Sequence, residues 1–449
     1  MDNFIRYAQK KGADYAEIHS IETKQTNIEL QNKDTKELSF SNIKGFSARV
    51  LYKGAFGSAY SNKNEFKLLI DKAIKIAKVL SKENPNVRLK EFAPIKKKFS
   101  VKCKINPNDI NIEDKKNNLL KFEILPKISM ININYADFNK KYCFINSEGR
   151  DLELNDYMSG LFVWAYAKEG NKIENFLKPE REHCGYEIME RYGAVVNEAM
   201  VKAKELLRAE FAKGGEFPVI INQKLAGVFA HEAVGHACEA DHIIKNNSVF
   251  VGKLNKKVAS DKVTIADDGS FIKWGYTPFD NEGVIGKRNI LIENGILKGY
   301  LHSRETASLL NMEPTGNGRA MNLSSKAMPR MTNTIIERGD SSFDEMLKEI
   351  KHGYYLKGSM GGEVNPITGE FLFNAQEGFL IENGRISKRV KTASLIGNIL
   401  DILQKISLVA KDLGGGSGYC GKDNQFVPVS ENAPHIKIDL AKVGGKGDK

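Results

Sequence analysis

Near the middle of the chain stands the stretch His231-Glu232-Ala233-Val234-Gly235-His236. Imidazole nitrogens are common zinc ligands, and a carboxylate beside a metal ion can accept a proton from water. Residues four apart share one helix face, but residues five apart are offset by roughly 140° at about 100° per residue. If both histidines bind one ion, the helix must therefore be irregular between them, for instance through a π-type turn with its strain at Gly235. The alternative is an ordinary helix with two unrelated histidines.

The residues just before this stretch predict a buried strand that leads into a helix. Pro218-Val219-Ile220-Ile221 is typical of a strand, and Asn222 is a good N-cap residue. The two histidines would then lie about two to three turns into a packed helix, which holds ligands better than a mobile loop does.

The first part of the chain predicts a domain in which helices pack on a sheet. Alternating apolar and polar residues predict strands at 15–19, 25–30, 37–40, 45–52, 128–135, 141–146 and 160–167. Amphipathic patterns predict helices at 2–11, 65–80, 114–121 and 187–212, with Asn64 as the cap of the second. Because Gly214-Gly215 would end the last helix, we expect an N-terminal α+β domain at 1–213, divisible at about residue 100.

Residues 214–441 predict a β-rich C-terminal domain that carries the histidine helix, so the fold class is α+β. Two Asn-Gly pairs, at Asn294-Gly295 and Asn383-Gly384, stand between apolar strands and predict hairpins. Ser342 and Glu345 fit a capping box for a helix that ends near residue 351. A long apolar helix is expected at 392–413, a glycine loop at 414–422, and a flexible tail at 442–449.

Composition narrows the class of protein. The chain has 449 residues, of which 41% are hydrophobic and 27% charged, as in soluble globular proteins with more than one domain. No apolar run approaches the ~18 residues of a membrane span, and the N-terminus lacks the apolar core of a signal peptide. We therefore expect a cytoplasmic protein. Its net charge of +11 is dispersed among acidic residues, so we do not expect nucleic-acid binding.

A catalytic zinc site normally needs a third protein ligand and one open position. Of the five cysteines, Cys420 lies in a glycine-rich segment where the backbone could approach a crowded centre. Cys238 would point away from His236 if the helix continued. Glu239 and Asp241 could be ligands, or acceptors that orient the imidazoles. Chemistry favours Cys420 over Glu239 but leaves both open.

The sequence resembles the TldD/PmbA family of metalloproteases. The resemblance covers about 215 to 445 and is looser over the first 200 residues. It begins with 231–236 and Glu239-Ala240-Asp241, and it continues in family order through 280–283, 291–295, 314–319, 329–334 and 420–422. The TldD-type member of this family carries H-E-x-x-x-H and its PmbA (TldE) partner lacks it. The chain therefore looks like the catalytic type.

The resemblance implies a zinc-dependent peptidase that cleaves extended or unfolded peptides. The family's ligands for one zinc ion (Zn²⁺) per subunit map to His231, His236 and Cys420, and its general base maps to Glu232. It also implies a homodimer or a heterodimer with a PmbA/TldE-like subunit. Substrate contacts, or residues that support the ligands, are expected at Glu239, Asp241, Asn317, Arg319, Arg330 and Asn333, with Arg319, Arg330 or a backbone N–H stabilising the oxyanion. Ser303 and Ser430 depart from the family pattern, where an acidic residue and a glycine are expected.

Two other functions stay open on the sequence. One is a non-catalytic, chaperone-like peptide-binding subunit, whose structural zinc would be closed by four protein ligands. The other is a modulator of a DNA-processing enzyme, a description attached to the family historically.

Overall fold

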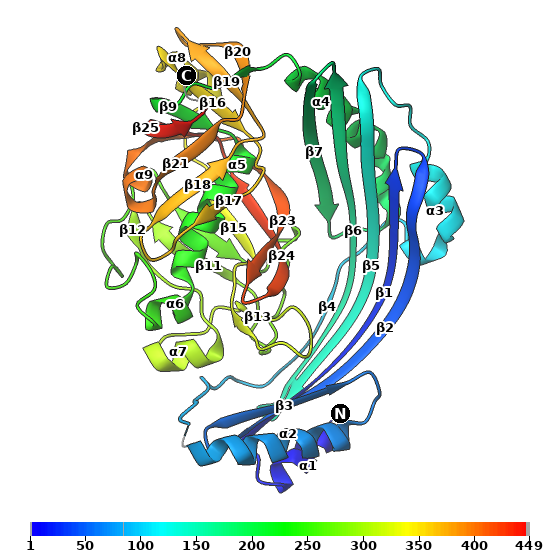
Figure 1. The fold of residues 1–449 in the computed structure, drawn as a ribbon. Helices are drawn as coiled ribbons and strands as arrows, with labels where there is room; N and C mark the ends of the chain where they lie inside the picture. The colour runs from blue at the N-terminus through cyan, green and yellow to red at the C-terminus, as the bar shows by residue number, and fades with distance from the viewer. Residues whose placement is uncertain (1, 84, 446–449) are drawn as a thin grey trace.

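A computed structural model describes residues 2–83 and 85–445. The protein is a mixed, strand-rich α+β protein with several sheets (Figure 1). This confirms the predicted α+β fold class with its many strands. The N-terminal sheet is a long curved layer with strand order β3-β2-β1-β5-β6-β4, and β7 pairs with β6. Its strands are β1 (Tyr15–Gln31), β2 (Asp34–Tyr52), β3 (Ala55–Ser61), β4 (Ile95–Ser100), β5 (Ile128–Asn146), β6 (Arg150–Glu169) and β7 (Lys172–Glu182).

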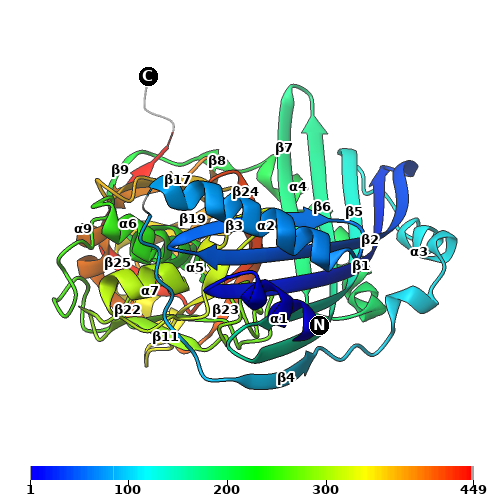
Figure 2. The same cartoon turned by 90° about the horizontal axis from the view of Figure 1, so that it is seen from below.

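Alternating residues give this sheet one face that packs against helices. Ile28, Ile133 and Val163 are completely buried, and they share a core with residues of α4 (Tyr192–Leu206). α3 (Ile112–Leu119) adds Leu119 to the same core. At the other end of the sheet, α1 (Asp2–Lys10) and α2 (Phe66–Leu80) cover β1, β2 and β3 (Figure 2).

Several predicted elements of this part have different bounds in the structure. The predicted strand pairs 15–19 with 25–30, 37–40 with 45–52, and 128–135 with 141–146 each form one long strand, because pairing continues through the polar residues between them. The helix predicted at 187–212 ends at Leu206, after a 3₁₀ segment η3 (Tyr186–Arg191) and before β8 (Glu210–Phe211). Asn64 does not cap α2, whose N-cap position is Glu65.

The C-terminal part contains two larger sheets, and the predicted boundary at 213/214 lies between β8 and β9. One sheet has the order β12-β11-β10-β15-β24-β23. Its strands are β10 (Ile265–Asp268), β11 (Arg288–Glu293), β12 (Ile296–Leu297), β15 (Asn333–Ile336), β23 (Gly414–Lys422) and β24 (Gln425–Ala433). The other sheet runs β17-β18-β21-β25-β9-β16-β19-β20-β8, with β22 paired to β25. Its remaining strands are β9 (Gly215–Ile221), β16 (His352–Lys357), β17 (Gly362–Val364), β18 (Glu370–Asn374), β19 (Glu377–Glu382), β20 (Arg385–Lys391), β21 (Ser394–Asn398), β22 (Ile406–Val409) and β25 (Ile436–Gly444).

Smaller elements complete this part. They are β13 (Gly318–Arg319), β14 (Met328–Pro329), α6 (Ala240–Ile244), α7 (Arg304–Leu310), α8 (Phe343–Lys348) and α9 (Ile399–Lys405). Both Asn-Gly hairpins are confirmed, because β11 pairs with β12 and β19 with β20, and all four turn residues have positive φ. The Ser342 capping box is also confirmed. Within the described residues, no helix is both long and apolar enough to cross a membrane.

Two predictions for the last sixty residues are wrong, and a third is wrong for the residues that the structure describes. The apolar run 392–413 forms β21, α9 and β22 instead of one helix, since a buried apolar run has no periodicity that separates strand from helix. The glycine-rich segment is the strand β23. Residues 442–444 belong to β25, while 446–449 lie outside the described residues.

α5 (Gln223–Phe229) connects the two larger sheets. It follows β9 of one sheet and packs on β24 of the other. A Cβ atom at Gly227 would lie 2.7 Å from the backbone carbon of Glu431 in β24. Glycine at this position therefore allows the close approach of helix and strand that places the histidine stretch.

Gly227→Ala is expected to lower the midpoint of thermal unfolding. Backbone atoms cannot turn away from the added methyl group as a side chain could, and overpacking typically costs about 1–3 kcal/mol. The matched control is Gly193→Ala in α4, where an added Cβ meets nothing within 4 Å. There alanine should stabilise the helix by about 0.5–1 kcal/mol. Shifts of equal sign in the two variants would contradict this account of the contact.

Candidate metal centre

The helix that carries the two histidines is irregular between them, as their spacing predicts. α5 is capped by Asn222, whose side chain accepts a hydrogen bond from Leu225 N (3.1 Å). It then passes into a π-helical turn, η4 (Ala230–Gly235), and a short 3₁₀ turn, η5 (His236–Cys238). Gly235 has ordinary helical angles (φ −57°, ψ −57°), so it does not hold backbone strain. A Cβ atom there would lie 2.7 Å from Met331 Cγ, so glycine serves close packing instead.

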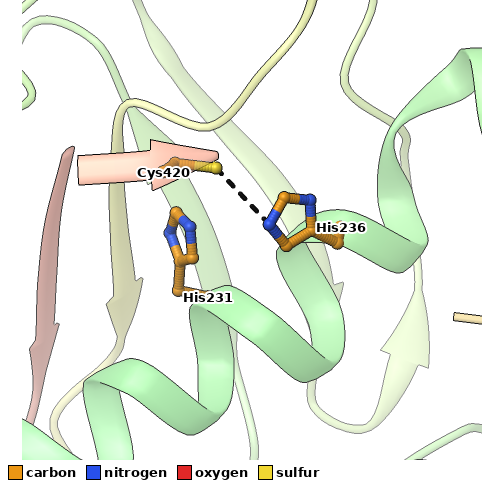
Figure 3. Close-up of side chains that lie close together, drawn as sticks. All are labelled: His231, His236 and Cys420. Atoms are coloured by element: carbon orange, nitrogen blue, oxygen red, sulfur yellow. Dashed lines mark hydrogen bonds between the residues drawn. The ribbon is translucent and has the colours of Figure 1, made fainter. Parts of the chain in front are cut away.

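His231, His236 and Cys420 point toward one another (Figure 3). The histidines come from the irregular helix, and Cys420 comes from β23, which lies beside β24. Cys420 Sγ is 3.4 Å from His236 Nε2. One donor atom from each of the three residues lies within 4.8 Å of the others. The fold thus brings the sulfur of Cys420 to two histidines that lie 184 or more residues earlier in the sequence.

Each imidazole has a hydrogen-bond partner at Nδ1, which leaves both Nε2 atoms to face the centre of the trio. His236 Nδ1 lies 3.1 Å from Glu239 Oε2. His231 Nδ1 lies 3.3 Å from Thr334 Oγ1, and this hydroxyl can donate onward to Asp267 Oδ2 at 3.5 Å. Metal-bound histidines usually donate their other ring N–H to a carboxylate, a carbonyl or water in this way.

His231 Nε2 provides a direct test of whether these residues fit a metal ion. It is buried, and no described residue hydrogen-bonds to it. A buried polar atom without a partner is unfavourable and calls for an explanation. A metal ion bound by this nitrogen, His236 Nε2 and the Cys420 sulfur would provide one. Two imidazoles and one thiolate are a donor set that suits zinc.

The surroundings of the trio shift the pKa values of the two histidines in opposite directions. Burial lowers the pKa of His231 well below its usual 6.5, and His236 and Arg330 lower it further. The imidazole of His231 is therefore neutral, the form that binds metals. Burial also opposes the charged form of His236, but Glu239 and Cys420 raise its pKa well above 6.5. Metal binding would accordingly displace a proton from His236.

Glu232 lies beside the trio but is not part of it. Its Oε2 is 3.6 Å from His236 Nε2, and the side chain is 33% exposed. Burial raises the pKa of Glu232, and Glu431 and Glu239 contribute in the same direction against the opposing effect of His236. A carboxylate with a raised pKa that stays accessible to water is suited to accept and return a proton.

The other predicted site residues surround the trio. Glu239 and Asp241 both accept hydrogen bonds from Lys422. Arg330 donates to the Cys420 carbonyl (2.5 Å), and Arg319 donates to the carbonyls of Met331 and Pro428. Both arginines are buried and point their guanidinium groups at backbone carbonyls. The proposed oxyanion role therefore gains no support from their contacts and stays a prediction.

Asn317 and Asn333 hold the neighbouring strands. Asn317 donates to Asp267 (2.8 Å) and to the Arg330 carbonyl (2.9 Å), and Asn333 donates to the carbonyls of Asp268 and Phe271. Substrate contacts at these positions stay predictions.

The two residues that depart from the family pattern have structural contacts. Ser303 caps α7, and Ser430 donates to Asn333 Oδ1 (2.6 Å).

Two residues behind His231 were missed from the sequence. Thr334 lies within the run 329–334 that carries the resemblance, but a threonine in a strand gives no separate signal. Asp267 offered a better one, because a carboxylate that directly follows the apolar residues Ile265 and Ala266 must find donors if the strand is buried. Its oxygens accept from Thr332 N, Thr332 Oγ1 and Asn317.

Comparison with known proteins identifies the class to which this fold and donor set belong. The profile of the PmbA/TldA metallopeptidase C-terminal domain matches residues 214–445, and that of PmbA/TldA metallopeptidase domain 1 matches 16–77. A metalloprotease of Methanocaldococcus jannaschii is 42% identical over 94% of this chain and 96% of its own length. A zinc metalloprotease TldD homolog of Saccharolobus solfataricus is 31% identical over 99% of this chain and its full length (100%). The chain belongs to the TldD/PmbA family of metalloproteases.

Solved structures share the fold over the whole chain. A Thermotoga maritima protein described as a modulator of a DNA gyrase is 25% identical, with a TM-score of 0.83 over 99% of both chains. TldE from Thermococcus kodakarensis is 23% identical, with a TM-score of 0.82 over 99% of this chain and 100% of its own. The second likeness is one of fold alone.

Proposed function

We propose that the chain is the catalytic, TldD-type member of its family and hydrolyses peptide bonds with one zinc ion held by His231, His236 and Cys420. The observation that carries this proposal is the convergence of three donors on a place where His231 Nε2 has no hydrogen-bond partner among the described residues. Glu232 beside the trio supplies the proton acceptor that hydrolysis requires.

Each side chain has a definite task in this proposal. A bound zinc ion supplies Lewis acidity, which makes water more acidic and polarises a carbonyl. Glu232 accepts a proton from the attacking water and returns it to the leaving amine. Glu239 and Thr334 keep the two Nδ1 atoms engaged, so that both Nε2 atoms face Cys420. Because a thiolate donates more charge to a metal than a third imidazole, proton transfer to Glu232 gains importance.

The preferred substrate in this proposal is an extended polypeptide. β23, which carries Cys420, stands at the end of its sheet and pairs only with β24 among the described strands. An extended peptide can add to such an edge through backbone hydrogen bonds, which need no particular side chains.

The assembly we propose is a dimer, either of two copies or with a PmbA/TldE-like subunit. The likeness in fold to TldE supports a common scaffold for two such subunits. The mass of the protein in solution, alone and with a TldE-like chain added, separates the two arrangements.

A purely structural zinc would favour a chaperone-like subunit instead. Such sites are normally closed by four protein ligands. Within the part of the chain that the structure describes, the cluster around Cys420 contains three candidate ligands. An accessible carboxylate next to an incomplete ligand set favours catalysis.

Chelation is expected to abolish cleavage of an unfolded protein, and added zinc is expected to restore it. The purified protein should contain about one zinc ion per chain, because His231, His236 and Cys420 together provide the ligands for one ion. Elemental analysis and a cleavage assay with a reduced, unfolded substrate measure both quantities. The folded form of the same substrate is the control and should stay intact. Equal cleavage before and after complete zinc removal would rule out the proposed function.

A further inference from the structure

Lys422 lies next to the metal centre but is not one of its candidate ligands. Cys420 and Lys422 are two residues apart in β23, so their side chains leave the same face of the strand. Lys422 is only 8% exposed. Its Nζ lies 3.0 Å from Glu239 Oε2, 2.8 Å from Asp241 Oδ1 and 3.3 Å from the Pro329 carbonyl oxygen. A lysine buried among three acceptors has a defined position.

The Glu239 oxygen that accepts from Lys422 also faces His236. Glu239 Oε2 is 3.1 Å from His236 Nδ1 and 3.0 Å from Lys422 Nζ, and the Glu239 side chain is completely buried. Glu239 thus connects a residue of β23 to a candidate ligand on the irregular helix. The strand that delivers the Cys420 sulfur also delivers the cation that holds this carboxylate.

A second cation competes for the same carboxylate. Arg330 Nε lies 4.0 Å from Glu239 Oε1, and neither atom has a hydrogen-bond partner among the described residues. If the ammonium group of Lys422 were absent, Arg330 would draw Glu239 away from His236. The imidazole would then lose the acceptor that holds its ring with Nε2 toward Cys420.

Lys422 also fills a second group of possible metal ligands. Glu239, Asp241 and His242 offer donor atoms within 4.8 Å of one another. The ammonium group of Lys422 hydrogen-bonds two of these three residues. It therefore supplies the positive charge that a metal ion would otherwise bring to this cluster. The arrangement is consistent with one metal ion at the neighbouring trio.

We propose that Lys422 is a positioning residue of the metal centre: it holds Glu239 against His236 Nδ1 and so fixes His236 Nε2 for the ion. This inference rests on the proposed zinc site. In this proposal Lys422 acts on the metal ion through Glu239 and His236, and it touches neither the ion nor the substrate.

The test is the zinc affinity of Lys422→Met, measured by competition with a chelator of known affinity. Loss of a residue that orients a metal-bound histidine typically weakens binding about 10- to 100-fold, and we expect a loss in that range. Lys422→Arg keeps the charge and should lose less. The control is Lys437→Met in β25, since Lys437 is equally buried (9% exposed) and also pairs with two carboxylates. It should bind zinc as the unmodified protein does.

A double-mutant cycle with Glu239→Gln separates positioning from general stability. If Lys422 acts through Glu239, Lys422→Met should weaken zinc binding much less in the Glu239→Gln background. The absorption spectrum of the cobalt-substituted protein should change in Lys422→Met and stay unchanged in Lys437→Met, because it reports ligand geometry.

Additive losses, or a Lys422→Met variant with unchanged zinc affinity, would overturn the inference while leaving the proposed function standing. Absence of zinc binding by the unmodified protein would instead overturn the proposed function.

Discussion

Glu232→Gln is expected to abolish peptide cleavage while the zinc content stays at the level of the unmodified protein. Glutamine keeps the size of the side chain but cannot accept a proton, and Glu232 is not one of the three candidate ligands. Loss of a general base typically lowers the rate about 10²- to 10⁴-fold. The expected effect falls on kcat, because the carboxylate acts on the reacting water. Cleavage rates and elemental analysis of the same preparation measure both properties.

The control for this variant is Glu337→Gln. Glu337 also lies in the C-terminal part, its side chain is 34% exposed against 33% for Glu232, and it pairs with Arg288 away from the trio. It should cleave normally. A Glu232→Gln variant that cuts peptides at the normal rate would show that another group takes the proton.

Cys420→Ala is expected to remove most of the zinc from the purified protein. The thiolate is one of three candidate ligands, and two imidazoles alone do not complete a catalytic zinc site. Cleavage should fall in parallel with zinc content, in contrast to Glu232→Gln, where the two separate. Elemental analysis after dialysis, together with the cleavage rate, measures the effect.

Cys238→Ala is the matched control. Cys238 is buried like Cys420 (0% and 3% exposed) and lies two residues after His236, but it is absent from the trio. Its replacement also removes a sulfur atom from the hydrophobic core that contains Cys420, and it should leave the zinc content unchanged. If Cys420→Ala kept its zinc, the third ligand would be Glu239 or a residue elsewhere.

Local geometry was the part of the site that could be predicted most securely from the sequence. The five-residue interval between His231 and His236 requires an irregular helix if both bind one ion, and the structure has a π-helical turn there. The strain expected at Gly235 is not found, because a glycine needed for close packing looks the same in a sequence. Thr334 and Asp267 could not be placed behind His231, since their approach depends on how β10, β15 and the helix pack.

The fold could be predicted where one face of an element is buried. The strands of the N-terminal sheet alternate in polarity because helices cover one face only, so their existence was clear although their lengths were not. The segment 392–413 lacks such alternation. The buried apolar residues of β21, α9 and β22 all belong to one core, so the apolar pattern does not mark where each element begins and ends. The glycines of β23 predict a loop because glycine has a low strand propensity. The segment is nevertheless a strand because it pairs with β24, and this pairing cannot be inferred from propensity.

X-ray absorption spectroscopy of the zinc-loaded protein tests the central claim most directly, since it reads the ligands of the ion itself. We predict one sulfur at about 2.3 Å and two imidazole nitrogens at about 2.0–2.1 Å, with one further light atom from solvent. The sulfur signal should disappear in Cys420→Ala and persist in Cys238→Ala. A zinc ion without a sulfur ligand, or one closed by four protein ligands, would contradict the proposed site.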